Sequence, residues 1–292
     1  MLLPKPYPDE LVGSVFMRAS RWTGLTFQRL LAHLAGERAN SHSMLLPSYP
    51  GIASACGLTP EALVRHHSLF PYAVSFLPPD IREARLVLFA SAPHQRAGGS
   101  LAQKIVRNSR ELKFCPECVI EDVQAFGESY WHCLHQLDGY LHCAKHACNL
   151  QVAPLALRTR QQVFPNEVRS IARSILLTAN PLTVARLSVR VRDAFYWRLK
   201  LPRDLHALYL RSARMLGYTL SSRRALAGAL ACDVTRYFGA ELLEALGCPE
   251  AQNGVSWPGR MLRRDGDQFS PIKHVLLGQF FRDAPRRDPD TT

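Results

Sequence analysis

The stretch that decides the fold is CPECVIEDVQAFGESYWHCLHQLDGYLHCAKH, residues 115–146. It opens with Cys115 and Cys118 around a Pro-Glu pair and closes with Cys143 and His146 around an Ala-Lys pair. A Cys-x-x-Cys turn directs two thiolates to one point, and a Cys-x-x-His turn supplies two further ligands for a tetrahedral Zn²⁺ ion. Four protein ligands leave no position for water. The spacing therefore predicts a structural zinc site that stabilises the fold.

Other side chains in or beside this stretch carry the same ligand chemistry. The substitute ligands, or members of a second site, are His132, Cys133, His135, His142 and Cys148. The paired turns favour the first set of four, and His132 and His135 are expected to form hydrogen bonds inside the module. A redox Cys-x-x-Cys would stand at a helix N-terminus in a βαβ unit, and the sequence indicates none here. The tight spacing predicts turns and short strands rather than long helices.

The rest of the chain is typical of a cytosolic protein. No apolar run approaches the roughly 20 residues that cross a bilayer, so no membrane association is expected. Pro and Asp interrupt the start, MLLPKPYPDE, where a signal peptide would be apolar. Thiols stay reduced in the cytosol. Cys56, Cys232 and Cys248 stand singly among apolar neighbours and are therefore expected to be small buried side chains.

The charge is strongly and unevenly positive. The 292 residues contain 36 Lys and Arg against 24 Asp and Glu, a net charge of +12. Residues 1–155 hold 14 basic and 12 acidic side chains, whereas residues 156–292 hold 22 and 12. A basic region gains free energy on binding nucleic acid because neutralised phosphates release counterions. The second half is therefore expected to contact DNA or a nucleoprotein, although solvated arginines would give the same composition.

The N-terminal region reads as a series of helices. Residues 9–23 predict a helix with Asp9 as N-cap, Trp22 on the buried face and Gly24 at the C-terminus. FQRLLAHLAG, residues 27–36, predicts a second helix. Thr59 followed by Pro and Glu predicts the start of a third.

Helices are again expected beyond residue 168, after a polar linker at 157–169. Asp204 is expected to cap one helix, and Ser221 or Ser222 to cap the next, with a break near Thr235. A final helix is expected to begin at Ser270-Pro271. Helix, short turn and helix in a basic region are typical of a helix-turn-helix.

Candidate phosphate contacts in this part are Arg223, Arg224, Arg263 and Arg264. Arg223 and Arg224 stand at the start of an expected helix. For any single one of the four, an ordinary solvated side chain explains the residue as well.

The sequence thus predicts a mainly α protein with a small zinc-ribbon-like module between two helical regions. The expected divisions are a helical domain at 1–110, the zinc module at 111–155, a basic helix-turn-helix-like domain at 156–285 and a disordered tail at 286–292.

Three separated segments resemble the TniQ/TnsD family of transposon target-selection proteins. Residues 115–146 are similar to its zinc signature, a CPxC turn followed by an aromatic-rich HQ(L/I)xG core and C-x-x-H. PYPDELVGSVFMR, residues 6–18, resembles the opening of the family. SPIKHVLLGQFF, residues 270–281, is similar to its HP-x-[RK]-H-L-x-L segment, with Ser270 in place of the usual His. The zinc segment is the most specific of the three.

The resemblance implies a non-catalytic role in choosing the insertion site of a transposon. Family members bind target DNA directly or dock on an RNA-guided (CRISPR) effector complex. They recruit an ATP-dependent transposition regulator, a TnsC-like ATPase, and through it the transposase. The resemblance places Cys115, Cys118, Cys143 and His146 at the metal-ligand positions, and the protein in the bacterial cytoplasm at the nucleoid. The target sequence and homodimerisation stay open.

Two other classes of protein are alternatives, a metal-dependent nuclease and a transcriptional regulator. A ββα-metal nuclease needs a His base, an Asn and a second His around a cation, and His132, His135 and Asn149 offer these residue types. The HQLDGYL stretch and the Cys-x-x-His turn occupy the place where that motif's spacing belongs. The sequence contains no GxxxxGK[ST] segment and no convincing carboxylate set for a two-metal transposase. The remaining alternative is a zinc-containing DNA-binding transcriptional regulator, which would bind its operator alone.

Overall fold

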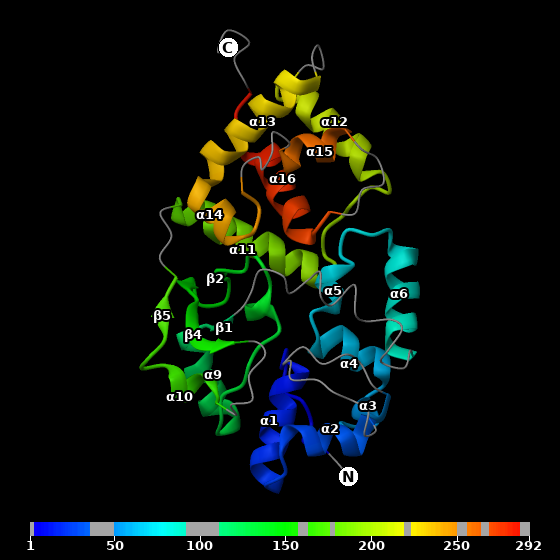
Figure 1. Ribbon diagram of the computed structural model, residues 1–292, viewed down its shortest axis with the longest axis vertical. Coiled ribbons are helices and arrows are strands. Elements are labelled where there is room, and N and C mark those ends of the chain that lie inside the picture. Colours follow the sequence, from blue (N-terminus) through cyan, green and yellow to red (C-terminus); the bar gives the residue numbers. More distant parts are fainter. Residues whose placement is uncertain are drawn as a thin grey trace.

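The computed structural model describes residues 3–35, 50–91, 111–156, 163–175, 179–218, 223–249, 256–263 and 269–286. This part of the chain is mainly helical with a few short strands, as predicted. The elements form three groups in an elongated molecule: N-terminal helices, a Cys/His module beside them, and C-terminal helices at the opposite end (Figure 1). None of the described helices is long and apolar enough to cross a membrane.

The N-terminal group is built from short helices. They are α1 (Val12–Thr23), α2 (Phe27–Ala35), α3 (Pro50–Ala55), α4 (Pro60–His67), α5 (Phe70–Ala73) and α6 (Pro79–Ser91). The predicted stop at Gly24 is confirmed, because its φ of 70° lets its N–H reach Ser20 O. The predicted cap at Thr59 is also confirmed, since its hydroxyl accepts from Ala62 N at 3.2 Å.

Two details of α1 were predicted wrongly. The helix begins at Val12 with Leu11 as N-cap, not at Asp9. Asp9 has a φ of 58° and its carboxylate accepts from Leu134 N, so it caps a turn of the Cys/His module instead. Trp22 is 63% exposed rather than buried. Its ring lies 5.3 Å from the Arg18 guanidinium carbon.

The Cys/His module combines a helix with small antiparallel sheets. Its elements are β1 (Glu111–Phe114), α9 (Pro116–Phe126), the 3₁₀ turn η1 (Leu134–Gln136), β2 (His142–Cys143), β3 (Cys148–Asn149), β4 (Gln151–Ala156), α10 (Pro165–Val168) and β5 (Arg173–Ser174). The sheet order is β1-β4-β5, and β2 pairs with β3. The expected turns and short strands are present as η1, β2 and β3, but the expectation that they would replace a long helix was wrong, because α9 fills 11 residues of the stretch. Helix α9 begins after its N-cap Cys115, with Pro116 at its first position, and ends at its C-cap Gly127.

The supposed linker at 157–169 also belongs partly to the module. Residues 157–162 lie outside the described part, but Phe164 is only 2% exposed and α10 follows it. The indole N–H of Trp131 donates to Val163 O at 3.0 Å. This segment therefore packs on the module and is not a free linker.

The C-terminal helices are α11 (Pro181–Phe195), α12 (Leu205–Met215), α13 (Arg223–Phe238), α14 (Ala240–Ala245), α15 (Trp257–Arg263) and α16 (Pro271–Asp283). Asp204 caps α12 as predicted, accepting from Ala207 N at 2.8 Å. The predicted break near Thr235 was wrong: α13 continues to Phe238 and ends at Gly239, whose φ is 83°. The expected caps Ser221 and Ser222 and most of the predicted tail lie outside the described residues.

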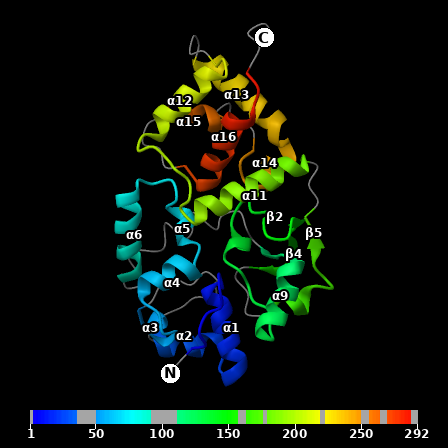
Figure 2. The same cartoon turned by 180° about the vertical axis from the view of Figure 1, so that it is seen from behind.

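Helix α11 joins the three groups. It crosses the molecule between the C-terminal helices and the two lower groups (Figure 2) and contacts α16, β2 and α5. One continuous set of buried apolar side chains runs from the module through α11 into α12–α16. A separate apolar cluster lies among α1, α2, α3 and α4. The module is thus packed against both ends, and the domain boundaries given above stay predictions.

Candidate metal centre

The predicted ligands converge at the start of α9. Cys115 is the N-cap of this helix, and its Sγ accepts from the backbone N of Cys118, one turn on. The hairpin of β2 and β3 brings Cys143 and His146 to the same point. The four ligand atoms all lie within 4.8 Å of one another and could hold a metal ion.

The distances suit tetrahedral coordination. Metal–sulfur bonds of about 2.3 Å and metal–nitrogen bonds of about 2.0 Å place two sulfurs about 3.8 Å apart and a sulfur and a nitrogen about 3.5 Å apart. Cys118 Sγ and Cys143 Sγ are 3.9 Å apart. His146 Nδ1 is 3.4 Å from Cys115 Sγ, 3.4 Å from Cys118 Sγ and 3.6 Å from Cys143 Sγ. The donor set therefore fits a thiolate-preferring ion.

The electrostatics of the cluster point the same way. Contacts with the thiols of Cys115 and Cys143, together with burial, raise the pKa of Cys118. The same kind of contact with Cys115 and Cys118 lowers the pKa of Cys143. Buried thiolates this close repel one another, so a dication is needed before all three are deprotonated.

A carboxylate orients the histidine. Glu121 Oε1, on the second turn of α9, lies 2.9 Å from His146 Nε2. Lys145, the neighbour of His146 in the sequence, forms an ion pair with the same carboxylate. A proton held on Nε2 leaves Nδ1 unprotonated and directed at the three sulfurs, which is the usual arrangement of a metal-bound histidine. Glu121 was not among the predicted residues.

Of the substitute ligands, two touch the cluster. Cys148 Sγ is 3.4 Å from Cys115 Sγ, and His135 Nε2 is 3.8 Å from Cys118 Sγ. The described residues contain no second group of three or more side chains placed to share an ion. Cys56 and Cys248 are buried as predicted, but Cys232 is exposed.

The Cys-x-x-Cys pair does stand at a helix N-terminus, contrary to expectation. The neighbouring strands β1 and β4 are antiparallel, so this helix is not part of the βαβ unit of a redox protein.

For the nuclease alternative, His132 and His135 lie near each other with ring centroids 4.7 Å apart. The third residue of that motif, Asn149, hydrogen-bonds instead to His142 at 3.0 Å, on the β2–β3 hairpin.

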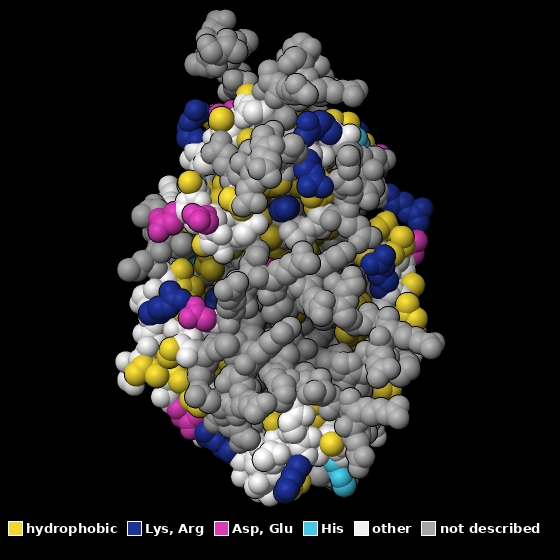
Figure 3. All heavy atoms as spheres, in the orientation of Figure 1, with side chains coloured by type: hydrophobic (Ala, Val, Ile, Leu, Met, Phe, Trp, Pro, Cys, Tyr) yellow, Lys and Arg dark blue, Asp and Glu magenta, His cyan; other side chains and the backbone are white. Residues whose placement is uncertain are grey.

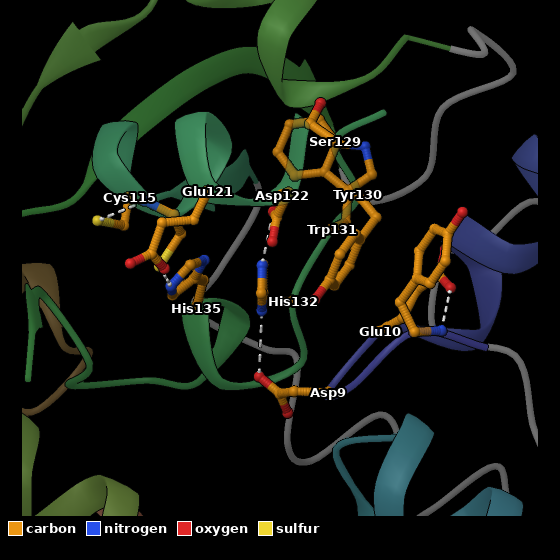
Figure 4. Close-up of polar contacts among 12 residues, drawn as sticks. Asp9, Glu10, Cys115, Glu121, Asp122, Ser129, Tyr130, Trp131, His132 and His135 are labelled. Carbon is orange, nitrogen blue, oxygen red and sulfur yellow. Dashed lines mark hydrogen bonds and ion pairs between the residues drawn. The ribbon is translucent and has the colours of Figure 1, made fainter. Parts of the chain in front are cut away.

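His132 ties the module to the N-terminal segment instead. Figure 4 shows its ring between two carboxylates, with Nε2 2.9 Å from Asp122 Oδ2 and Nδ1 3.7 Å from Asp9 Oδ2. Burial alone would lower the pKa of His132, but the contacts with Asp122 and Asp9 outweigh it and raise the pKa to about 9. The backbone reinforces the link, since Cys133 N donates to Asp9 O at 2.7 Å. The expectation of a hydrogen-bonded His132 is confirmed.

The HQLDG stretch, residues 135–139, binds β1 inside the module through Gln136 and packs against α11 and α16 at Gly139. Gln136 bonds both the N–H and the C=O of Lys113 on β1, at 3.0 and 2.9 Å. Gly139 has a φ of 82°, and a Cβ there would lie 2.4 Å from Ile272 Cδ1 on α16. The side chain of Ser188 on α11 accepts from the backbone N of Leu141. Gln136 is thus explained by its hydrogen bonds to β1, and Gly139 by its close packing on α16, rather than by metal binding.

The predicted DNA contacts are only partly described. Arg223 and Arg224 open α13, but their side chains lie outside the described residues, as does all of Arg264. Arg263 is exposed at the end of α15. Several Lys and Arg side chains lie over the C-terminal helices on the face seen in Figure 3. Helices α12 and α15 carry four exposed arginines among the described residues, Arg211, Arg214, Arg260 and Arg263.

Comparison with known proteins gives two family matches in sequence order. The TniQ family model matches residues 1–150, just over half of the chain, and a model described as Tn7-like transposition protein D matches residues 198–287. The chain is 25% identical over 303 residues to a protein of Escherichia coli named transposon Tn7 transposition protein TnsD. The match covers 94% of this chain and 57% of that protein, so the chain spans a little over half of its relative's length. The chain belongs to the TniQ/TnsD family.

Proposed function

We propose that this chain selects the target site in DNA transposition and catalyses no step itself. The observation that supports the proposal is the order of the two family matches, TniQ at residues 1–150 and the Tn7-like transposition protein D at residues 198–287. The relative from Escherichia coli is named a transposition protein of Tn7. A four-ligand metal site with no open position agrees with a structural ion and not with a catalytic one.

The metal in this proposal is Zn²⁺, held by Cys115, Cys118, Cys143 and His146. Three thiolates and an imidazole are ligands that Zn²⁺ prefers, and a tetrahedral arrangement suits its filled d shell. Zinc would supply folding free energy by fixing the start of α9 on the β2–β3 hairpin.

The DNA-binding part in this proposal is the C-terminal group of helices. It lies in the half of the chain that carries 22 basic against 12 acidic residues. Arg223, Arg224, Arg263 and Arg264 are proposed to contact phosphates. Helices α12 and α13 are separated by a short connection, and they are the proposed helix-turn-helix-like pair.

The partners in this proposal are an ATP-dependent transposition regulator and, through it, the transposase. The N-terminal helices that follow PYPDELVG are proposed as the recruiting surface. Docking on an RNA-guided effector complex is the alternative to direct DNA recognition, and both routes end in the same recruitment.

The test is a reconstituted insertion assay with and without the chain, using the regulator and transposase from the same element. Site-specific insertion is expected only when the chain is present, and the regulator is expected to co-purify with it. Unchanged site-specific insertion in its absence would reject the proposal. Binding to an operator with no requirement for transposition proteins would support the transcriptional regulator, and metal-dependent DNA cleavage that His132→Ala abolishes would support a nuclease.

A further inference from the structure

The connection between α11 and α12 forms a basic surface that does not include the four arginines assigned to DNA contact. Residues 196–203, YWRLKLPR, contain three basic side chains and no acidic one. Figures 1 and 2 show this connection running from the end of α11, beside α5, past the upper end of α6 to α12. It therefore joins the N-terminal helices to the C-terminal helices at the surface of the molecule.

Trp197 anchors the connection on the N-terminal helices. Its φ of 55° lies in the left-handed region, which a bulky residue adopts only where its surroundings impose it. Its indole N–H donates to Pro71 O at 2.8 Å, and the guanidinium carbon of Arg82 on α6 lies 4.9 Å from its ring centroid. The backbone on either side of Trp197 is therefore held in place, and little backbone entropy is left to lose when its neighbours bind a ligand.

Arg198 follows this anchor and lies exposed at the surface. Its guanidinium carbon lies 5.0 Å from the ring centroid of Tyr196, which is itself 42% exposed. A guanidinium that stacks on an aromatic ring keeps its N–H groups at the edge, where they can donate to two oxygens of one phosphate. Among the described residues no carboxylate forms an ion pair with Arg198, so this charge is available to an external anion.

Lys200 and Arg203 continue this surface toward α12. Lys200 is exposed and, like Arg198, forms no ion pair within the described part of the chain. Arg203 lies 3.2 Å from Asp80 on α6, but these two side chains are 78% and 62% exposed. Such an open ion pair contributes little free energy and can be exchanged for another anion. Figure 3 shows Lys and Arg side chains at the edge of the molecule just above α6 and over the C-terminal helices beside it.

The partner that fits this surface is the phosphate backbone of nucleic acid. The acidic side chains that flank the connection are already engaged, since Asp193 binds Arg192 at 3.0 Å and Asp204 caps α12 by accepting from Ala207 N at 2.8 Å. Separate cations close together match an array of phosphates, each of which releases counterions when it is neutralised. Helices α12 and α13, the proposed DNA-binding pair, follow directly in the chain, so a duplex on them lies close to the connection. The competing partner is an acidic protein surface.

We propose that the α11–α12 connection binds the phosphate backbone of DNA, with Arg198 and Lys200 each contacting a phosphate and Tyr196 holding the guanidinium of Arg198 in place. The proposal rests on the proposed function in one respect, namely that DNA lies on the C-terminal helices. It adds a second set of contacts, which extends the bound DNA from these helices toward the N-terminal group.

The test measures binding of the full chain to a fluorescently labelled DNA duplex by anisotropy over a salt series. Arg198→Ala/Lys200→Ala is expected to bind roughly 10-fold more weakly or worse at about 0.1 M salt. The slope of the logarithm of the binding constant against the logarithm of salt concentration should fall by about 2, because each lost phosphate contact removes about 0.9. Arg198→Gln/Lys200→Gln keeps most of the apolar stems and is expected to give the same result.

The matched control is Arg169→Ala/Arg173→Ala. Both arginines are exposed, beside α10 and on β5, at the opposite edge of the molecule (Figure 1). This control removes the same charge and is expected to leave the salt slope unchanged. A Tm equal to that of the native chain in all three variants establishes that the fold is kept.

The proposal is overturned by an unchanged salt slope in both variants of Arg198 and Lys200, or by an equal change of slope in the control. It is also overturned if these variants bind DNA undiminished while co-purification of the transposition regulator is lost, which would assign the surface to an acidic protein. A native chain that binds no duplex and is still required for site-specific insertion overturns it as well, and leaves target selection standing.

Discussion

Glu121 and Asp122 are neighbours on α9, yet they serve two different connections. Glu121 reaches His146 of the metal cluster, and Asp122 reaches His132, whose other nitrogen faces Asp9 of the N-terminal segment. Two adjacent carboxylates therefore connect one helix, α9, to both the metal cluster and the N-terminal segment. The sequence shows both residues, but neither lies in a metal motif, and only the direction of each side chain on α9 reveals its role.

Loss of the Glu121 carboxylate should weaken metal binding. In Glu121→Gln the carboxylate oxygen that lies 2.9 Å from His146 Nε2 is replaced by a neutral amide, so the imidazole is a poorer ligand and its orientation is less fixed. We expect roughly a 10- to 100-fold loss of affinity. Competition with a chromophoric chelator measures it. Glu117→Gln, an exposed position in the first turn of the same helix, is the matched control. Equal affinities of the two variants would contradict the role of Glu121.

His132 should make stability fall at alkaline pH. Its pKa in the folded chain is about 9, above the ordinary value of 6.5, so the folded state favours the protonated ring. The resulting stabilisation is fully present below pH 6.5 and is lost as the pH rises through 9. For this shift it amounts to about 3 kcal/mol. Thermal unfolding from pH 6 to pH 10 should show a steeper decline for the native chain than for His132→Gln. Parallel curves would show that folding does not raise the pKa of His132.

At the scale of single elements, the accuracy of prediction depends on how local the determining interaction is. The caps at Thr59 and Asp204 were predicted correctly because each hydroxyl or carboxylate acts on a backbone N–H three residues away. Asp9 failed as a cap because its carboxylate bonds Leu134, 125 residues along the chain. Long-range contacts of this kind have no periodic signal in a single sequence.

The metal cluster was predicted for the same local reason, although its surroundings were not. Each of the two ligand pairs has a spacing of three residues, which is recognisable in the sequence alone. The structure brings the four ligand atoms of these pairs together. Helix α9 was not predicted, although the sequence holds ordinary helix signals there: Cys115 as N-cap followed by Pro116 and Glu117, and Gly127 at the end. The same cysteines also fit a turn, and the spacing of ligands does not distinguish a turn from the start of a helix. The break at Gly239 was displaced to Thr235, since a β-branched residue is a weaker helix terminator than a glycine with positive φ.

The turn after η1 should tolerate no side chain at Gly139. Its φ of 82° strains an alanine, and the new Cβ would lie 2.4 Å from Ile272 Cδ1. Gly139→Ala is expected to lower the free energy of unfolding by about 2–4 kcal/mol, measured by urea denaturation. Gly228→Ala is the control with the opposite sign. Gly228 lies inside α13 with nothing within 4 Å of an added Cβ, so alanine should stabilise by about 0.5–1 kcal/mol. A neutral Gly139→Ala would mean that α16 does not pack on this turn.

For the whole molecule, the metal cluster lies on a core that continues into the C-terminal helices. Cys115, Cys118 and Cys143 are part of the same buried set as Leu187 on α11 and Leu276 on α16. Removal of the ion should therefore affect more than the module. After exhaustive chelation, and in Cys143→Ser, we expect loss of about one zinc per chain together with a lower Tm. An unchanged Tm in the metal-free chain would exclude a structural ion.

The last consequence concerns the charge of the whole molecule, which is concentrated in residues 156–292. If these helices contact DNA through phosphates, the logarithm of the binding constant should fall linearly with the logarithm of salt concentration, by about 0.9 per phosphate contact. Replacement of all four proposed contacts by alanine should therefore weaken binding at moderate salt and reduce that slope by up to about 3–4. The four positions are Arg223, Arg224, Arg263 and Arg264.

The control for this experiment removes the same charge from the other end of the molecule. The control variant replaces four arginines of the N-terminal helices α1, α2, α4 and α6 by alanine: Arg21, Arg29, Arg65 and Arg85. Long-range attraction alone would make the two variants lose affinity alike, because both lower the net charge by four. Direct contact predicts a change of slope in the C-terminal variant only. Fluorescence anisotropy over a salt series distinguishes the two cases, and equal slopes for the C-terminal variant and the native chain would remove these four arginines from the DNA interface.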